Sequence, residues 1–173
     1  MNILQVTPRY PPQSGGVETH VRKISEHLAA LGHTVTVLTA DAEIRDKQRE
    51  YRNNVEIRRF FSLAPNQSVH FCPQITSTVR KTNLDIVHAH NYHSLPVFFA
   101  ALGIDDQRFI VTPHYHGQSA SKLRDHLLTV YYQFGRWAIQ QADKVIAVSD
   151  WEREQLKTDF HVEATIIPNG VNV

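Results

Sequence analysis

Short apolar runs alternate along the chain with longer segments whose apolar residues recur every three or four positions. The short runs predict strands at Ile3–Val6, Val35–Leu38, Val55–Phe60, Asp85–Ala89, Phe109–Thr112, Lys144–Val148 and Thr165–Ile167. The segments between them predict helices at Val17–Leu31, Cys72–Lys81, Leu95–Leu102, Ser121–Ala142 and from Asp150 onward. Strands joined by helices predict an α/β domain, a Rossmann-like doubly wound parallel sheet with helices on both faces.

The loops that follow the strands are the places where ligands are expected. In doubly wound sheets, ligands bind beyond the carboxyl ends of the strands, where the strand order reverses. This rule selects the loops Thr7–Gly16, Thr39–Asn54, His90–Ser94, Pro113–Ala120 and Ser149–Trp151.

Composition and charge narrow the classes of function. Apolar residues make up 42% and charged residues 20% of the 173 residues, which is typical of one globular domain. The net charge of +1, without any block of like charge, argues against nucleic acid as a partner. The start of the chain lacks a basic leader, and no apolar run reaches the roughly 18 residues of a membrane span. We therefore expect a cytoplasmic protein.

The first loop ends in a pair of glycines, Gly15 and Gly16, directly before the first predicted helix. The backbone N–H groups and the dipole at a helix N-terminus favour an anion, so a phosphate could bind there. A flexible turn into the helix is the alternative. A dinucleotide site with Asp41 as its ribose-binding acid is disfavoured, because the loop contains no G-x-G-x-x-G and is too long for that tight turn.

Histidines are dense in two loops, which read VHAHNYH and TPHYHG. An H-x-H pair can begin a metal site, but neither carboxylates nor cysteines accompany these residues, so we expect no metal. Imidazoles that recognise hydroxyl groups are the favoured interpretation. His114 follows a strand and Pro113, so we expect it to be exposed at the ligand-bearing edge, whereas His88 and His116 could be structural.

Six segments occur along the chain in the order PRYPPQSGGVETHV, LAALGHTVTVLTA, DIVHAHNYHS, VTPHYHG, ADKVIAVSDWEREQL and IIPNGVNV. In this order and spacing they resemble the retaining family-4 glycosyltransferases, whose GT-B fold has two Rossmann domains. The resemblance covers essentially the whole chain. It departs at Asn172, where the family more often has aspartate.

The resemblance implies roles for individual residues. Gly15 and Gly16 would approach the diphosphate of the nucleotide-sugar donor, and His114 would be the catalytic histidine that orients the transferred sugar. The acceptor or sugar side would be formed by Arg9, Glu18, His20, His90, Asn91, His93, His116 and Ser149. No metal and no cofactor other than the nucleotide-sugar co-substrate is implied.

The family's cationic pair for the donor diphosphate and its carboxylate motif for the nucleotide-sugar belong to a second domain, for which no sequence remains here. We therefore expect residues 1–173 to be the N-terminal, acceptor-side domain, ending at the interdomain linker 168–173 and inactive alone. The full-length protein would be a hexosyltransferase that acts on an acceptor hydroxyl. A nucleotide-sugar epimerase and a sugar- or nucleotide-binding module without turnover stay as alternatives.

The long predicted helix mixes cationic and aromatic residues, among them Lys122, Arg124, Arg136, Phe134 and Trp137. Such a mixture could lie on an anionic membrane surface, although packing in a core or between domains is the favoured interpretation.

Overall fold

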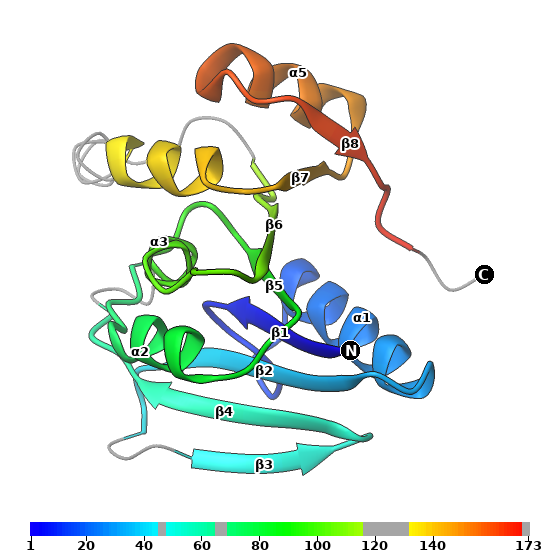
Figure 1. The fold of residues 1–173 in the computed structure, drawn as a ribbon, viewed down its shortest axis with the longest axis vertical. Coiled ribbons are helices and arrows are strands. Elements are labelled where there is room, and N and C mark those ends of the chain that lie inside the picture. The colour runs from blue at the N-terminus through cyan, green and yellow to red at the C-terminus, as the bar shows by residue number, and fades with distance from the viewer. Residues whose placement is uncertain (45–47, 65–68, 116–131, 171–173) are drawn as a thin grey trace.

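The computed structural model describes residues 1–44, 48–64, 69–115 and 132–170. Its strands are β1 (Asn2–Thr7), β2 (Thr34–Asp41), β3 (Gln48–Arg52), β4 (Val55–Phe61), β5 (Ile86–His90), β6 (Arg108–Thr112), β7 (Lys144–Ala147) and β8 (Ala164–Ile166). Its helices are α1 (Gly16–Ala30), α2 (Gln74–Lys81), α3 (Pro96–Ala101) and α5 (Asp150–Phe160), with a further helical segment at 132–140. The strands form one sheet in the order β3-β4-β2-β1-β5-β6-β7-β8 (Figure 1).

The sheet is parallel except for one edge strand. β3 pairs with β4 in the antiparallel direction, and it lies in the segment Thr39–Asn54 that the sequence predicted to be a loop. That prediction was wrong because the five residues of β3 are all exposed, so they lack the apolar alternation of a half-buried strand. The tight turn at Asn53 and Asn54, both with positive φ, joins β3 to β4.

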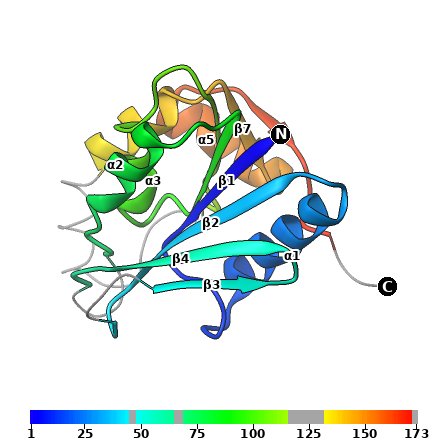
Figure 2. The ribbon, with the colours of Figure 1, turned by 60° about the horizontal axis from the view of Figure 1, so that its bottom comes forward.

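The helices cover both faces of the sheet, as predicted. One apolar cluster packs the even-numbered side chains of β1, such as Leu4, against α2, α3, α5 and the segment 132–140. The other packs Val21 of α1 against β2 and β4 on the opposite face. Figures 1 and 2 show α1 on one side of the strands and α2 and α3 on the other.

The strand order reverses between β1 and β5. From β1 the chain passes through α1 to β2 on one side, whereas β5 pairs with β1 on the other side and leads on to β6. The carboxyl ends of β1, β5 and β6 therefore meet at the switch point, which is the place where a doubly wound sheet binds its ligand.

The helical segment 132–140 is the described part of the helix predicted at Ser121–Ala142, so Lys122 and Arg124 lie outside the described residues. Phe134 and Trp137 are 48% and 38% exposed. Both rings contact the ring of Phe98 on α3. Among the residues that the structure describes, no helix is both long and apolar enough to cross a membrane.

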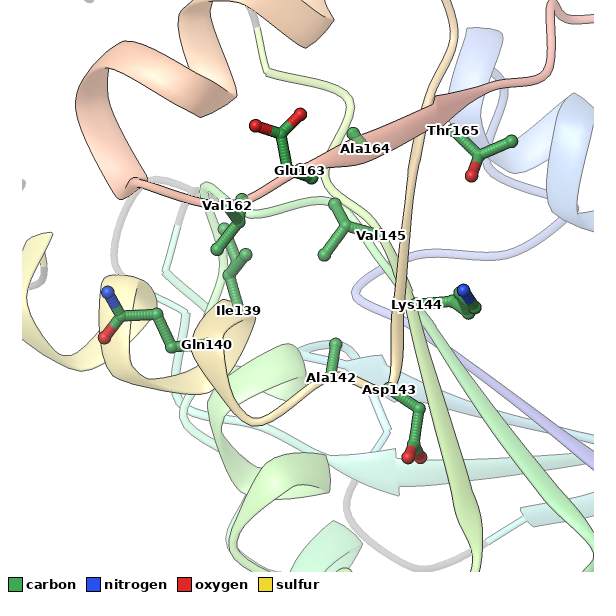
Figure 3. Close-up of a pocket in the computed structure, with 10 residues that line it drawn as sticks. All are labelled: Ile139, Gln140, Ala142, Asp143, Lys144, Val145, Val162, Glu163, Ala164 and Thr165. Carbon is green, nitrogen blue, oxygen red and sulfur yellow. The ribbon is translucent and has the colours of Figure 1, made fainter.

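A hollow of about 400 Å³ lies at the opposite edge of the sheet from the switch point. It is lined by Ile139, Gln140, Ala142, Asp143, Lys144, Val145, Val162, Glu163, Ala164 and Thr165 (Figure 3). Its residues surround the amino-terminal ends of β7 and β8. Because ligands of this architecture bind at the carboxyl ends, we do not assign the functional site to this hollow.

Candidate functional site

The three strands at the switch point carry polar side chains on the face that α1 covers. Gln5 and Thr7 of β1, His88 and His90 of β5 and Thr112 of β6 are each at most 8% exposed. The strand register aligns Gln5 with His88 and His90 with Thr112, so they share one face. Buried polar groups destabilise a fold unless they are hydrogen-bonded. A polar patch in the middle of a sheet at its switch point is therefore a candidate site whose hydrogen bonds need an account.

Two hydrogen bonds order the histidines of β5. Nε2 of His88 lies 2.8 Å from Oγ1 of Thr112, and Nε2 of His90 lies 2.7 Å from Oε1 of Gln5. Because a carboxamide oxygen only accepts, Nε2 of His90 carries the proton and donates it. Nδ1 of His90 then keeps its lone pair, and it has no hydrogen-bond partner among the described residues.

Burial keeps these imidazoles neutral. It lowers the pKa of His88 to about 3 and that of His90 well below the ordinary value, with smaller contributions from neighbouring histidines. Burial likewise lowers the pKa of His20, on the first turns of α1. A neutral ring has one donor and one acceptor nitrogen, so His90, whose N–H is bound to Gln5, keeps Nδ1 as an acceptor for a hydroxyl group.

Three histidines from different elements converge at the switch point. One ring nitrogen of each of His20, His90 and His114 lies within 4.8 Å of those of the other two. The ring centroids are 5.2 Å apart for His20 and His114, 5.9 Å for His20 and His90, and 5.8 Å for His90 and His114. The residues thus come from α1, the end of β5 and the segment after β6.

His114 differs from its expected environment. It follows β6 at the ligand-bearing edge, but its side chain is only 3% exposed, so the expectation of an exposed imidazole was wrong. The reason is the packing of His114 against the ring of His20, which α1 brings over the same edge. The backbone φ of His114 is 49°, a left-handed conformation that few residues other than glycine and asparagine adopt.

The N-terminus of α1 already holds a carboxylate of the protein. Glu18 is buried in the first turn, and its Oε1 lies 2.8 Å from Nε of Arg9. A Cβ on Gly15 would collide with this carboxylate, whereas a Cβ on Gly16 would meet open space. A phosphate that approaches the two glycines would thus meet an ion pair as well as the backbone N–H groups.

The other predicted residues are dispersed. Oδ1 of Asn91 accepts from the backbone N–H of His93 and holds a local turn, while the ring of His93 stacks on Tyr115. Ser149 caps α5, since its hydroxyl accepts from the N–H of Glu152. His116 lies outside the described residues.

Sequence reasoning did not reveal the contacts that three residues make around the candidate site. Gln5 was assigned to an apolar strand, although a polar residue at the centre of such a strand is itself a signal. Glu152 accepts from the backbone N–H groups of Tyr115 and Val148. Arg59 of β4 donates to carbonyl groups of the loop after β1, a contact that spacing cannot reveal.

The chain matches the family described as Glycosyltransferase Family 4 over residues 14–173. It is 30% identical to a phosphatidyl-myo-inositol mannosyltransferase of Mycobacterium leprae, over 100% of this chain and 46% of that protein. It is 26% identical to the phosphatidylinositol N-acetylglucosaminyltransferase GPI3 subunit of Saccharomyces cerevisiae, over 98% of this chain and 39% of that protein. The chain thus spans about half the length or less of these curated relatives.

Solved glycosyltransferases share the fold. Sucrose-phosphate synthase from Thermosynechococcus elongatus matches 99% of this chain and 48% of its own, with a TM-score of 0.70 and 20% identity. The catalytic domain of starch synthase IV from Arabidopsis thaliana matches 98% of this chain and 51% of its own, with a TM-score of 0.62 and 15% identity. The fold is that of one Rossmann-like half of a GT-B enzyme, and the chain belongs to glycosyltransferase family 4.

Proposed function

We propose that the full-length protein transfers a hexose from a nucleotide-sugar to an acceptor hydroxyl with retention of configuration, and that residues 1–173 are its acceptor-side domain. The observation that carries this proposal is the convergence of His20, His90 and His114 at the switch point of the sheet, where His20 belongs to the helix that begins at Gly16. Imidazoles can bind hydroxyl groups and the dipole of a helix N-terminus favours an anion, so this convergence supports the proposal.

The chemistry requires a stabilised leaving group and an oriented sugar. Backbone N–H groups at Gly15 and Gly16, together with the α1 dipole, would stabilise negative charge that develops on the departing diphosphate. Cations of a second domain would complete this site. His114 would orient the sugar, and Nδ1 of His90 would accept from a hydroxyl. The transfer needs no metal and no cofactor beyond the donor.

We further propose that a lipid carries the acceptor hydroxyl. Two of the relatives are named for glycosyl transfer to phosphatidylinositol. In this chain, the partly exposed rings of Phe134 and Trp137 would supply apolar contacts to the boundary of a membrane. The nucleotide-sugar would then enter from water, while the acceptor would stay in the membrane.

Product analysis of the full-length protein tests the reaction. NMR of the purified product should show the same anomeric configuration as the donor, and omission of the acceptor should abolish consumption of the nucleotide-sugar beyond slow hydrolysis. An epimerase would instead convert the donor without any acceptor. Failure of every nucleotide-sugar to react would favour a binding module.

Calorimetry on the 173-residue chain tests whether the donor site is shared between two domains. We expect no turnover and donor affinity weaker than the low micromolar range, because the cations for the diphosphate would come from the second domain. Turnover by this chain, or low-micromolar donor binding, would contradict the split site.

The acceptor proposal has its own assay. The full-length protein should glycosylate phosphatidylinositol in vesicles far faster than free myo-inositol, and the double substitution Phe134→Ser, Trp137→Ser should reduce the vesicle reaction alone. Equal rates on both acceptors would overturn it without affecting the glycosyltransferase proposal.

A further inference from the structure

We propose that His20, His90 and His114 form a site for a divalent transition-metal ion of the Zn²⁺ class when no nucleotide-sugar is bound. One nitrogen of each imidazole lies within 4.8 Å of the others, whereas ligands around tetrahedral zinc are about 3.4 Å apart, given zinc–nitrogen bonds of roughly 2.0 to 2.1 Å. His20 is only half-buried on its helix, so rotation of its side chain can shorten its distances to the other two imidazoles.

Gln5 holds the ring of His90 in the way that a protein oxygen commonly holds a metal-binding histidine. A metal-binding histidine usually donates its second ring N–H to an oxygen of the protein, which fixes the tautomer and the ring plane. Oε1 of Gln5 accepts in this way from Nε2 of His90 at 2.7 Å. Nδ1 of the fully buried His90 is left with a lone pair and no hydrogen-bond partner among the described residues. A cation would satisfy that buried acceptor.

The three imidazole nitrogens determine which class of metal ion could bind. Among the described residues, the group that could share an ion consists of these three imidazoles, without a carboxylate or a thiolate. Imidazole nitrogen suits Zn²⁺, Co²⁺, Ni²⁺ and Cu²⁺, whereas Mg²⁺ and Ca²⁺ require oxygen ligands. Three histidines leave a fourth position for water, as in other three-histidine zinc sites. We expected no metal because carboxylates and cysteines are absent from the histidine motifs. A site of three imidazoles needs neither, so their absence is compatible with zinc.

The consequence for activity rests on the proposed function. If His114 orients the transferred sugar, the ion and the donor compete for that imidazole, so Zn²⁺ inhibits the full-length protein rather than serving its reaction. Metal binding by the 173-residue chain is measured without any donor, so failure of the metal site and failure of the glycosyltransferase proposal are distinguishable.

Titration of the metal-free 173-residue chain with Co²⁺ tests the site. We expect saturation at one ion per chain with the intense visible absorption of tetrahedral cobalt, displacement of cobalt by Zn²⁺, and an increased Tm at saturating Zn²⁺ because only the folded chain holds the site. Mg²⁺ should produce none of these effects.

Matched variants distinguish metal binding at this site from metal binding at other histidines of the chain. His20→Ala should weaken Co²⁺ binding at least about tenfold, and Gln5→Leu should weaken it about 10- to 100-fold through loss of the hydrogen bond to His90. His27→Ala removes an exposed histidine of the same helix and should leave binding unchanged. Circular dichroism checks that each variant folds. No cobalt spectrum in the unsubstituted chain, or equal weakening by His20→Ala and His27→Ala, would overturn the proposal.

Discussion

The backbone N–H of Tyr115 donates a hydrogen bond of 2.6 Å to Oε1 of Glu152, which lies 37 residues further along the chain. The other carboxylate oxygen accepts from the N–H of Val148 at 2.7 Å, and Glu152 is 1% exposed. One buried carboxylate thus joins the residue after His114 to the start of α5. Glu152 is therefore a positioning residue for the loop that holds the histidine.

Glu152→Ala should lower the free energy of unfolding by on the order of 3 kcal/mol. The reason is that two partly buried N–H groups lose a charged acceptor, at roughly 1.5 to 3 kcal/mol each. Urea unfolding of the 173-residue chain measures this loss. Glu154→Ala is the control, since Glu154 is an exposed glutamate of the same helix, and it should cost less than about 0.5 kcal/mol. Equal effects of the two substitutions would contradict the role of Glu152.

Arg59 should hold the loop after β1. Its buried guanidinium donates to the carbonyl groups of Tyr10 and Pro11 and lies 2.7 Å from Oε1 of Glu50. Arg59→Leu leaves those carbonyl groups without their donor, so amide hydrogen exchange at the non-proline positions of residues 8–14 should accelerate at least about tenfold through local opening. Arg58→Leu, on the same strand but paired with Glu56, should leave the loop unchanged. Identical exchange in both variants would show that the loop does not depend on Arg59.

Stability should fall as the solution is acidified below about pH 6.5. The pKa of His88 is about 3 in the folded chain, and that of His90 is also well below 6.5, because both are buried. Below pH 6.5 the unfolded chain binds protons at these residues while the folded chain does not, so acid favours unfolding by about 1.4 kcal/mol per pH unit for each histidine. Above that pH both states are neutral, and the stability is fully present.

Urea unfolding with a chelator present measures this dependence. Between about pH 7.5 and pH 5.5 the free energy of unfolding should fall by roughly 2 to 3 kcal/mol from these two groups. His88→Gln should remove about half of the fall, whereas His27→Gln, at an exposed position, should leave it intact. A free energy that does not change over this range would contradict burial of neutral histidines.

The alternation of apolar runs predicted the sheet because each central strand carries its own apolar signal, as in β5 and β6. It missed β3, which is exposed along its whole length and is held by pairing with β4 rather than by burial. The turn at Asn53 and Asn54 was the available signal, since asparagine tolerates the positive φ that such hairpins need.

The candidate site was predictable only as a set of loops. The rule that ligands bind beyond the carboxyl ends of the strands selected the loops of His90 and His114 correctly as neighbours. It could not reveal that α1 turns His20 toward both, or that Gln5 fixes the tautomer of His90. These relationships depend on side-chain packing between elements far apart in the sequence, on which periodicity carries no information.

The sharpest test concerns the imidazole of His114 in the full-length protein. Alanine is a poor substitute there, because the left-handed backbone at φ 49° costs roughly 1 to 2 kcal/mol for most side chains. Asparagine tolerates this conformation and stays polar, so His114→Asn removes the imidazole while the turn is kept. Turnover should fall about 10²- to 10³-fold, which corresponds to an activation free energy higher by roughly 3 to 4 kcal/mol, if the ring is a preorganised contact to the reacting sugar.

His161→Asn is the matched control, since His161 is exposed and also has a left-handed φ of 57°. It should keep nearly full turnover, and the free energy of unfolding of both variants should change by about 1 kcal/mol or less. If His114→Asn retains more than about a third of the original turnover, or fails to fold, His114 is a structural residue and the assignment of the sugar site is wrong.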